Sequence, residues 1–180
     1  MMKQLAFILV LVLICGCGAS KSATVATNDT RLDDLIAKRS FTLEAQWARP
    51  QPTAAMASLA SSGILGMGNT AGSINLIGNP NYFKVMGDSV SVFLPYFGER
   101  WAGGGYGDQE AIAFEGIPTD FKIDALDKDK GYRITLSMKA DSEHYRVAMR
   151  LFPNLNGSVR VTSSHRFPIH YQGKLDVLPE

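Results

Sequence analysis

The chain has 180 residues, with 18 Lys and Arg against 17 Asp and Glu, and only two Cys. This length fits a single domain that can bury a core, and two Cys exclude a disulfide-rich scaffold. The formal charge is +1, so the chain lacks the strongly basic composition of most nucleic-acid-binding proteins. We therefore expect no nucleic-acid partner.

The first 16 residues have the pattern of an export signal. A single positive charge, Lys3, precedes an uninterrupted apolar run over residues 5–14. This run is too short for a helix that needs about 20 residues to span a bilayer, but it suits a signal peptide. It leads into Gly16-Cys17, which resembles the bacterial lipobox, where a small residue precedes the Cys that receives lipid. Cys15 fits poorly because a bulky Ile precedes it, and the alternatives are an ordinary cleaved signal or a buried helix.

Lipidation of Cys17, with acyl chains such as palmitate, predicts a protein held on a membrane without a spanning segment. Residues 17–28 are small and polar and predict a flexible tether, which leaves residues 29–180 as a single β domain. No acidic run follows the Cys, which favours the periplasmic face of the outer membrane in the cell envelope. Removal of residues 1–16 also removes Lys3, so the formal charge of the remaining chain falls to zero.

One helix is predicted, from Thr30 to Arg39. Thr30 can cap its N-terminus, and Asp33, three residues later, completes a weak capping box. Apolar residues at positions 32, 35 and 36 share one face, and basic residues at the end suit the helix dipole. A helix this short needs an apolar surface to dock on.

Apolar and polar residues then alternate with a period of two. This alternation is typical of strands with one buried and one wet face, as in antiparallel sheets. Turn-forming residues separate the strands at 87–88, 127–131, 141–143 and 156–157, and Asn156-Gly157 is the strongest hairpin signal. The predicted strands include residues 41–47, 82–86, 89–94, 121–125, 132–140, 145–152, 159–163 and 167–172.

These elements predict an all-β domain, an antiparallel meander of about nine strands with one short N-terminal helix. A lipocalin-like or partly open barrel is favoured, and a two-sheet sandwich is the alternative. No strand–helix–strand unit is visible, so a doubly wound fold is not expected.

One long segment, Pro50 to Gly72, does not fit the meander. It is rich in Ala, Ser and Gly, and loops of this length are usually functional or disordered. Its larger apolar residues are expected at the surface: Met56, Leu59, Ile64, Leu65 and Met67.

The candidate binding site is an aromatic segment, residues 96–107, which also contains five glycines. Aromatic residues and Arg are enriched at binding surfaces. The alternative is a loop that covers one end of the barrel and fills the core, because aromatic side chains pack more often than they bind. The candidate ligand contacts are Tyr96, Phe97, Trp101 and Tyr106, with Arg100 for an anionic group.

Signals for catalysis or metal binding are weak. His144, His165 and His170 are dispersed, and no Gly-x-Ser-x-Gly elbow occurs. A lipidated Cys17 leaves no free thiol in the chain that follows the signal. We therefore expect no metal and no cofactor. Carboxylates at 108, 110, 115, 120 and 124 are scattered, although two could pair across strands as in glycosidases.

Several stretches resemble a known family. Residues 83–90 have the sequence Phe-Lys-Val-Met-Gly-Asp-Ser-Val and residues 94–98 Leu-Pro-Tyr-Phe-Gly, followed by a glycine-tyrosine loop at 104–107 and Ile-Ala-Phe-Glu-Gly at 112–116. Together they resemble an uncharacterised family of envelope lipoproteins of Gram-negative, Bacteroidales-type anaerobes, a domain of unknown function. The resemblance covers residue 41 onward and implies an all-β domain on a lipid anchor, with no activity to carry over. In the family pattern an Arg directly follows residues 94–98, whereas Glu99 intervenes here before Arg100.

Three functions remain open. The first is an envelope lipoprotein that binds a small apolar or amphipathic ligand, such as a lipid, in a barrel cavity with the aromatic segment at its mouth. The second is a structural or protein-interaction module of the envelope, with a filled core and an exposed apolar patch. The third is a hydrolase with paired carboxylates.

Overall fold

The computed structural model describes residues 30–102, 111–127, 130–140 and 142–178. In these residues the chain forms two helices and ten strands. The helices are α2 (Arg31–Lys38) and α3 (Ala54–Ser61). The strands are β1 (Ser40–Pro50), β2 (Ile74–Asn75), β3 (Tyr82–Met86), β4 (Ser89–Pro95), β5 (Ala111–Gly116), β6 (Thr119–Leu126), β7 (Gly131–Ala140), β8 (Glu143–Leu151), β9 (Asn156–Ser163) and β10 (Ile169–Asp176).

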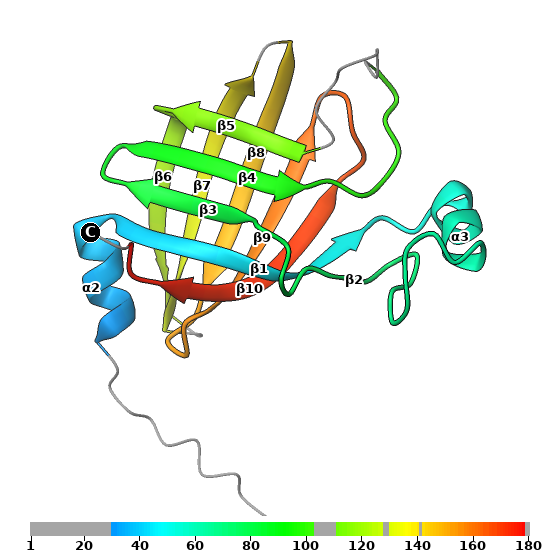
Figure 1. Cartoon of the computed structure of the whole chain (residues 1–180). Helices are drawn as coiled ribbons and strands as arrows, with labels where there is room; N and C mark the ends of the chain where they lie inside the picture. The colour runs from blue at the N-terminus through cyan, green and yellow to red at the C-terminus, as the bar shows by residue number, and fades with distance from the viewer. Residues whose placement is uncertain (1–29, 103–110, 128–129, 141, 179–180) are drawn as a thin grey trace, which may run out of the picture.

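The strands form one antiparallel sheet in the order β5-β4-β3-β1-β10-β9-β8-β7-β6, and the short β2 pairs with β1. The sheet curls, so that β3, β4 and β5 cross in front of β6 to β9 in Figure 1. Its two edges, β5 and β6, do not pair with each other. The predicted all-β, partly open barrel is confirmed, because the sheet is continuous and not split into two as in a sandwich.

The first strand of the chain lies in the middle of the sheet. β3 to β5 and β6 to β10 are two consecutive meanders, and β1 lies between β3 and β10. It pairs with β10 from Thr42, opposite Asp176, to Pro50, opposite Ile169. The predicted simple meander lacks this insertion, because a period of two identifies strands but not their order.

Inward-facing side chains fill the curled sheet. Buried and exposed residues alternate along the whole of β10, as the period of two predicts. The largest fully buried side chains include Tyr171, Phe41 and Phe83. The Tyr171 hydroxyl donates to the Pro95 carbonyl at 2.8 Å, and burial raises the pKa of Tyr171 well above its ordinary value. The core therefore holds bulky groups where a hollow barrel would hold a ligand.

Helix α2 covers one end of the barrel. It buries Leu32, Leu35 and Ile36, as predicted, and the Tyr132 hydroxyl of β7 donates to Asp33 at 2.8 Å. Thr30 makes no side-chain cap, so the predicted capping box is absent. The helix ends at Arg39, which is left-handed with a φ of 47° and donates its N–H to an earlier carbonyl, as C-caps commonly do.

A second helix, α3, occupies the long segment for which the sequence predicts no element. The Thr53 hydroxyl accepts from the Met56 N–H at 3.2 Å and caps it. Its sequence, AAMASLAS, has no amphipathic period that would reveal a helix. Met56, expected at the surface, is buried at 3% exposure and anchors α3. Leu65 is half-buried, whereas Leu59, Ile64 and Met67 are exposed as expected.

The turn between β8 and β9 lies earlier than the Asn156-Gly157 signal predicts. The Phe152 N–H donates to the Asn156 carbonyl at 3.0 Å, and Leu155 is left-handed with a φ of 58°. Gly157 instead lies buried within β9. A Cβ there would lie 2.4 Å from the Leu43 Cδ1 atom, so Gly157 occupies a tightly packed position in the core and does not form the turn.

A buried asparagine fixes β1 beside the start of β3. The Asn81 side chain accepts from the Ala45 N–H at 2.8 Å and donates to the Ala45 carbonyl at 3.0 Å. β1 has a bulge just after Ala45, so Asn81 satisfies backbone groups that β3 does not reach. On the other side of β1, a Cβ at Gly173 would lie 1.9 Å from the Glu44 carbonyl oxygen.

Candidate functional site

The described part of the aromatic segment, residues 96–102, lies at the end of the barrel opposite α2. β4 starts beside α2, where Arg39 and Asp88 form an ion pair at 2.5 Å, and leads away to this segment (Figure 1). Tyr96 and Phe97 are half-buried against the core, and Trp101 is 55% exposed. Tyr106 lies outside the described residues.

The segment rests on the loop between β9 and β10. The Trp101 N–H donates to the His165 carbonyl at 3.0 Å, and the Phe167 N–H donates to the Glu99 carbonyl at 3.1 Å. The Trp101 indole donates to the Ser164 carbonyl at 2.8 Å. Its ring meets the Phe167 ring edge-on, with 5.0 Å between centroids. Two segments far apart in the sequence are therefore held together by backbone and side chains.

A buried ion pair lies beneath both segments. Glu143, the first residue of β8, is 5% exposed, and Arg166 of the β9–β10 loop is 4% exposed. The Arg166 Nε atom lies 3.0 and 3.1 Å from the two carboxylate oxygens. The Ser163 and Tyr145 hydroxyls donate to the same carboxylate, and Arg100 Nη2 approaches it at 3.6 Å. We call these five residues the Glu143 cluster.

Glu143 is ionised although it is buried. Burial alone raises its pKa, but hydrogen bonds from Ser163 and Tyr145 and the charge of Arg166 outweigh burial. The net pKa of Glu143 lies below its ordinary value of 4.5. The pKa of Tyr145 is raised by burial and by its hydrogen bond to Glu143. At neutral pH the cluster is therefore a fixed charge pair.

The Glu143 cluster accounts for the position of the aromatic segment. Arg100, the candidate for an anionic ligand, faces a carboxylate of the chain itself. The Arg166 guanidinium lies 5.1 Å from the centre of the Tyr96 ring, in a cation–π contact. Residues 96–102 thus lie over one end of the barrel, and the ligand role of Tyr96, Phe97, Arg100, Trp101 and Tyr106 stays a prediction. Nothing in the sequence marks Glu143, because a lone carboxylate beside a turn is usually solvated.

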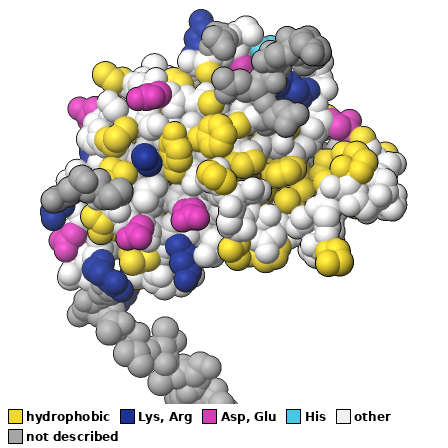
Figure 2. All heavy atoms as spheres, viewed as in Figure 1, with side chains coloured by type: hydrophobic (Ala, Val, Ile, Leu, Met, Phe, Trp, Pro, Cys, Tyr) yellow, Lys and Arg dark blue, Asp and Glu magenta, His cyan; other side chains and the backbone are white. Residues whose placement is uncertain are grey.

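A second candidate site is the arm, which we define as residues 51–80. It leaves the end of β1 and projects from the barrel with α3 at its tip (Figure 1). Asn69 orders it, since its side chain donates to the Leu65 carbonyl at 2.5 Å and accepts from the Asn75 N–H at 2.8 Å. Hydrophobic side chains gather over α3 and continue toward the barrel in Figure 2. The large exposed ones are Leu59, Ile64, Met67 and Ile77.

The arm carries no charge. No Lys, Arg, Asp or Glu occurs between Arg49 and Lys84, and no aromatic residue between Trp47 and Tyr82. Ile64 is 73% exposed and Ile77 67% exposed. An exposed apolar surface without charges is typical of a contact surface for another molecule.

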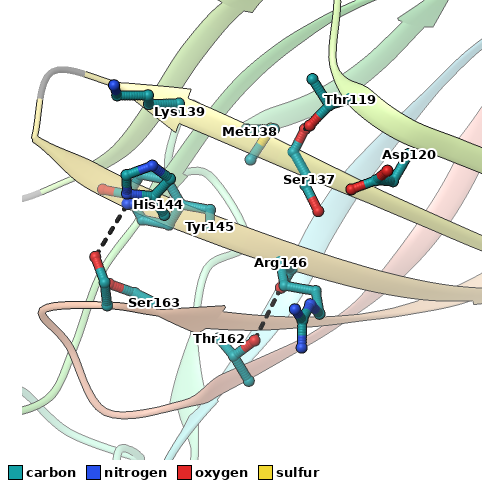
Figure 3. Close-up of a pocket in the computed structure, with 11 residues that line it drawn as sticks. Thr119, Asp120, Ser137, Met138, Lys139, His144, Tyr145, Arg146, Thr162 and Ser163 are labelled. Carbon is teal, nitrogen blue, oxygen red and sulfur yellow. Dashed lines mark hydrogen bonds between the residues drawn. The ribbon is translucent and has the colours of Figure 1, made fainter.

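A third candidate is a polar hollow of about 410 Å³ on the outer face of β6, β7, β8 and β9. It borders the Glu143 cluster, because Tyr145 and Ser163 belong to both. Figure 3 shows side chains from all four strands around it. The register places Lys139 opposite His144 and Ser137 opposite Arg146.

A bulge in β6 brings a carboxylate to the polar hollow. The register between β6 and β7 shifts between Thr119 and Lys122, and Asp120 is left-handed with a φ of 55°. Bulges of this kind re-aim a side chain. Among the residues that the structure describes around the hollow, Asp120 is the single carboxylate.

The residues considered for catalysis do not converge in the described part of the chain. His144 lines the polar hollow, whereas His165 lies in the β9–β10 loop and His170 on β10. Asp108 and Glu110 lie outside the described residues. Within the described residues, no group of three or more His, Cys, Asp or Glu side chains could hold a metal ion.

The predicted export signal, Cys17 and the tether lie in residues 1–29, outside the described residues. Among the helices that the structure does describe, none has the length and apolar character needed to cross a membrane.

Comparisons with known proteins identify a family. The model of a domain of unknown function (DUF4251) matches residues 23–175. Among solved structures, the chain is similar to a DUF4251 family protein from Bacteroides eggerthii. The two share 15% sequence identity with a TM-score of 0.56, over 84% of this chain and 89% of that one. At this identity the likeness shows the fold alone. No curated protein matches the chain.

Proposed function

Since the chain belongs to the DUF4251 family, a domain of unknown function, we propose its function from its own surfaces: a lipid-anchored, non-catalytic interaction module of the cell envelope. Lipid on Cys17 holds the domain at the outer membrane on the periplasmic side, and the arm docks on a protein partner. The observation that carries the proposal is the uncharged, exposed apolar surface of the arm.

The position of the arm supports a partner away from the membrane. The chain enters the domain at α2, and β1 separates α2 from the arm. The 11 residues of β1 span roughly 35 Å at the usual rise of a strand. A tether that joins α2 to lipid therefore leaves the arm at the far end of the domain, where another envelope protein can reach it.

The composition of the arm fits a protein surface better than a bilayer. Segments that lie in a membrane interface carry Lys and Arg on one face and Trp or Phe at the boundary, and the arm has none of these. The cores of protein interfaces are depleted in charge and enriched in Met, and Met67 is fully exposed. Burial of such a side chain contributes about 1.5–3 kcal/mol. The partner is expected to present an uncharged apolar surface.

The other two functions have less support. A small apolar ligand needs a cavity, and the bulky side chains of Phe41, Phe83 and Tyr171 are fully buried in the barrel interior. A hydrolase of the glycosidase type needs two facing carboxylates, and the described lining of the polar hollow contains Asp120 alone.

Anchoring is tested in cells that express the full chain or its Cys17→Ser variant. We expect labelled palmitate to mark the wild-type chain, which sediments with outer membranes, and not the variant. Cys15→Ser is the matched control and should keep the label. Labelling that persists in Cys17→Ser contradicts the anchor.

The partner is tested with a photo-crosslinking amino acid at Met67 in the full chain. We expect one discrete protein adduct, which Ile64→Asp abolishes, and none from the same amino acid at Gln172, an exposed position on β10. The identified partner, once purified, should bind the wild-type chain about tenfold tighter than Ile64→Asp, because charge burial in an apolar interface is unfavourable. Adducts with lipid or with a second copy of the chain overturn the assignment.

A further inference from the structure

The outer face of β7, β8 and β9 is strongly basic, although the whole chain is nearly neutral. These three strands contain five Lys and Arg and one carboxylate, Glu143. Glu143 is buried against Arg166, so it does not offset charge at the surface. All five cations are exposed: Arg133, Lys139, Arg146, Arg150 and Arg160.

The register gathers part of this charge at the polar hollow. Lys139 and His144 face each other across β7 and β8, and Arg146 lies between Ser137 of β7 and Thr162 of β9. Neighbouring strands lie about 4.8 Å apart, so these groups are within reach of one small ligand. Lys139 and Arg146 form no ion pair with a carboxylate in the part of the chain that the structure describes.

Hydroxyl groups stand among the cations. The lining of the polar hollow, drawn in Figure 3, includes the hydroxyls of Thr119, Ser137 and Thr162 and the carboxylate of Asp120. Lys and Arg bind carboxylate or phosphate groups, whereas hydroxyls and a carboxylate bind the hydroxyls of a sugar. Asp120 repels a ligand made of anionic groups alone, so the mixture favours a ligand with both kinds of group.

The same strands offer no platform for nucleic-acid bases. Single-stranded nucleic acid binds by stacking bases on aromatic side chains. The fully described β7, β8 and β9 contain no Phe or Trp and two Tyr, Tyr132 and Tyr145. Their hydroxyls are bonded to Asp33 and Glu143, and Tyr145 is buried.

We propose that the polar hollow and the adjoining basic face bind an acidic carbohydrate, a glycan that carries carboxylate or phosphate groups on hydroxyl-rich rings. Lys139 and Arg146 pair with an anionic group, Asp120 accepts from ring hydroxyls, and the Ser137 hydroxyl accepts from or donates to them. Arg160 lies two residues before Thr162 on β9, roughly 7 Å away along the strand, and binds the next anionic unit. This site is separate from the arm and stands whether or not the arm binds a protein.

Binding is measured by calorimetry on the full chain, purified in detergent, with two acidic probes: an oligogalacturonate and a phosphorylated mannan fragment. We expect at least one of them to bind, and a neutral malto-oligosaccharide of equal length not to bind. Arg146→Gln should weaken binding about tenfold, the typical loss for a charge-assisted contact. Lys38→Gln, which removes an exposed charge on α2, is the matched control and should leave the affinity unchanged.

Asp120→Asn separates a sugar from a bare polyanion. If Asp120 accepts from ring hydroxyls, the variant binds the acidic probe about fivefold more weakly, because the charge-assisted acceptor is lost. Tighter binding by the variant shows attraction of charge alone and overturns the carbohydrate assignment. Three other results would also overturn the carbohydrate assignment. The first is tighter binding of a DNA duplex than of either acidic probe, and the second is competition by inorganic phosphate at equal concentration. The third is failure of both acidic probes to bind.

Discussion

Glu143 connects four parts of the chain through one carboxylate: the aromatic segment, β8, β9 and the β9–β10 loop. We expect Glu143→Gln to lower the free energy of unfolding by about 3–5 kcal/mol, because the buried Arg166 then faces a neutral group. Denaturant unfolding at neutral pH measures this loss. Glu44→Gln, at an exposed carboxylate on β1, is the control and should change stability by less than about 0.5 kcal/mol.

The same residue predicts the response to acid. The pKa of Glu143 is lowered in the folded protein, so the unfolded chain takes up this proton first as pH falls. The stability that Glu143 contributes is therefore complete above its ordinary value of 4.5 and lost as pH falls through the lowered value. The gap in stability between the wild type and Glu143→Gln should stay constant from neutral pH down to about 4.5 and shrink as pH falls further, through the lowered pKa of Glu143. A gap that persists unchanged in stronger acid contradicts the lowered pKa.

Two buried glycines predict different tolerance to a methyl group. A Cβ at Gly173 would meet the backbone of β1, with the Glu44 oxygen at 1.9 Å, whereas at Gly157 it would meet the side-chain end of Leu43. The backbone of a paired strand cannot move aside as a leucine methyl group can. Gly173→Ala should therefore lower the free energy of unfolding more than Gly157→Ala. Overpacking typically costs about 1–3 kcal/mol, and Gly173→Ala should reach or exceed the upper end. Urea unfolding of both variants compares them, and equal losses would show that β1 can move.

At the level of elements, residues 53–71 of the arm are an insertion, whereas β2 further along the arm pairs with β1 in the sheet. The base of this insertion is narrow, since a Cβ at Gly72 would lie 3.5 Å from Pro52 Cγ. Replacement of residues 53–71 by a short Gly-Ser linker should leave a folded barrel, destabilised by about 2–4 kcal/mol through loss of the buried Met56 side chain. Circular dichroism and thermal unfolding test this. Collapse of the β signal would show that the arm is part of the core.

The elements also show what sequence patterns can predict. The strands were predictable because one face is buried and the other wet, as in β8 and β10. α3 was not, because Ala and Ser side chains leave no apolar stripe. The Asn156-Gly157 pair led to a wrong prediction of the turn position, because Gly157 is a buried residue that packs against Leu43.

The candidate sites were less accessible to prediction. The aromatic segment could be recognised from its composition. Its partner Glu143 lies far away in the sequence, and the two come together only in the folded protein. The polar hollow is assembled from single residues on four strands, so it leaves no local motif to recognise.

At the scale of the whole molecule, the fold separates charges that the sequence mixes. The formal charge of +1 suggests no electrostatic preference, yet β7 to β9 expose five cations. Ion exchange responds to such a patch and not to net charge alone. We expect the folded protein to bind a cation exchanger slightly above the pI of about 7.8 that its amino-acid composition gives. Arg146→Gln should elute clearly earlier than Lys38→Gln, although both remove one charge, and equal elution would contradict a concentrated patch.

The place of β1 in the sheet has a consequence for how the chain reaches its folded state. β1 pairs with β10, the last strand in chain order, so the barrel cannot close until both are present. Folds dominated by such distant pairings fold slowly, on the order of milliseconds to seconds. We propose that this chain reaches the cell envelope, and a chain that is exported through a membrane channel must stay unstructured during transit. For an exported chain, late closure by β10 would lengthen the time that the chain stays unstructured.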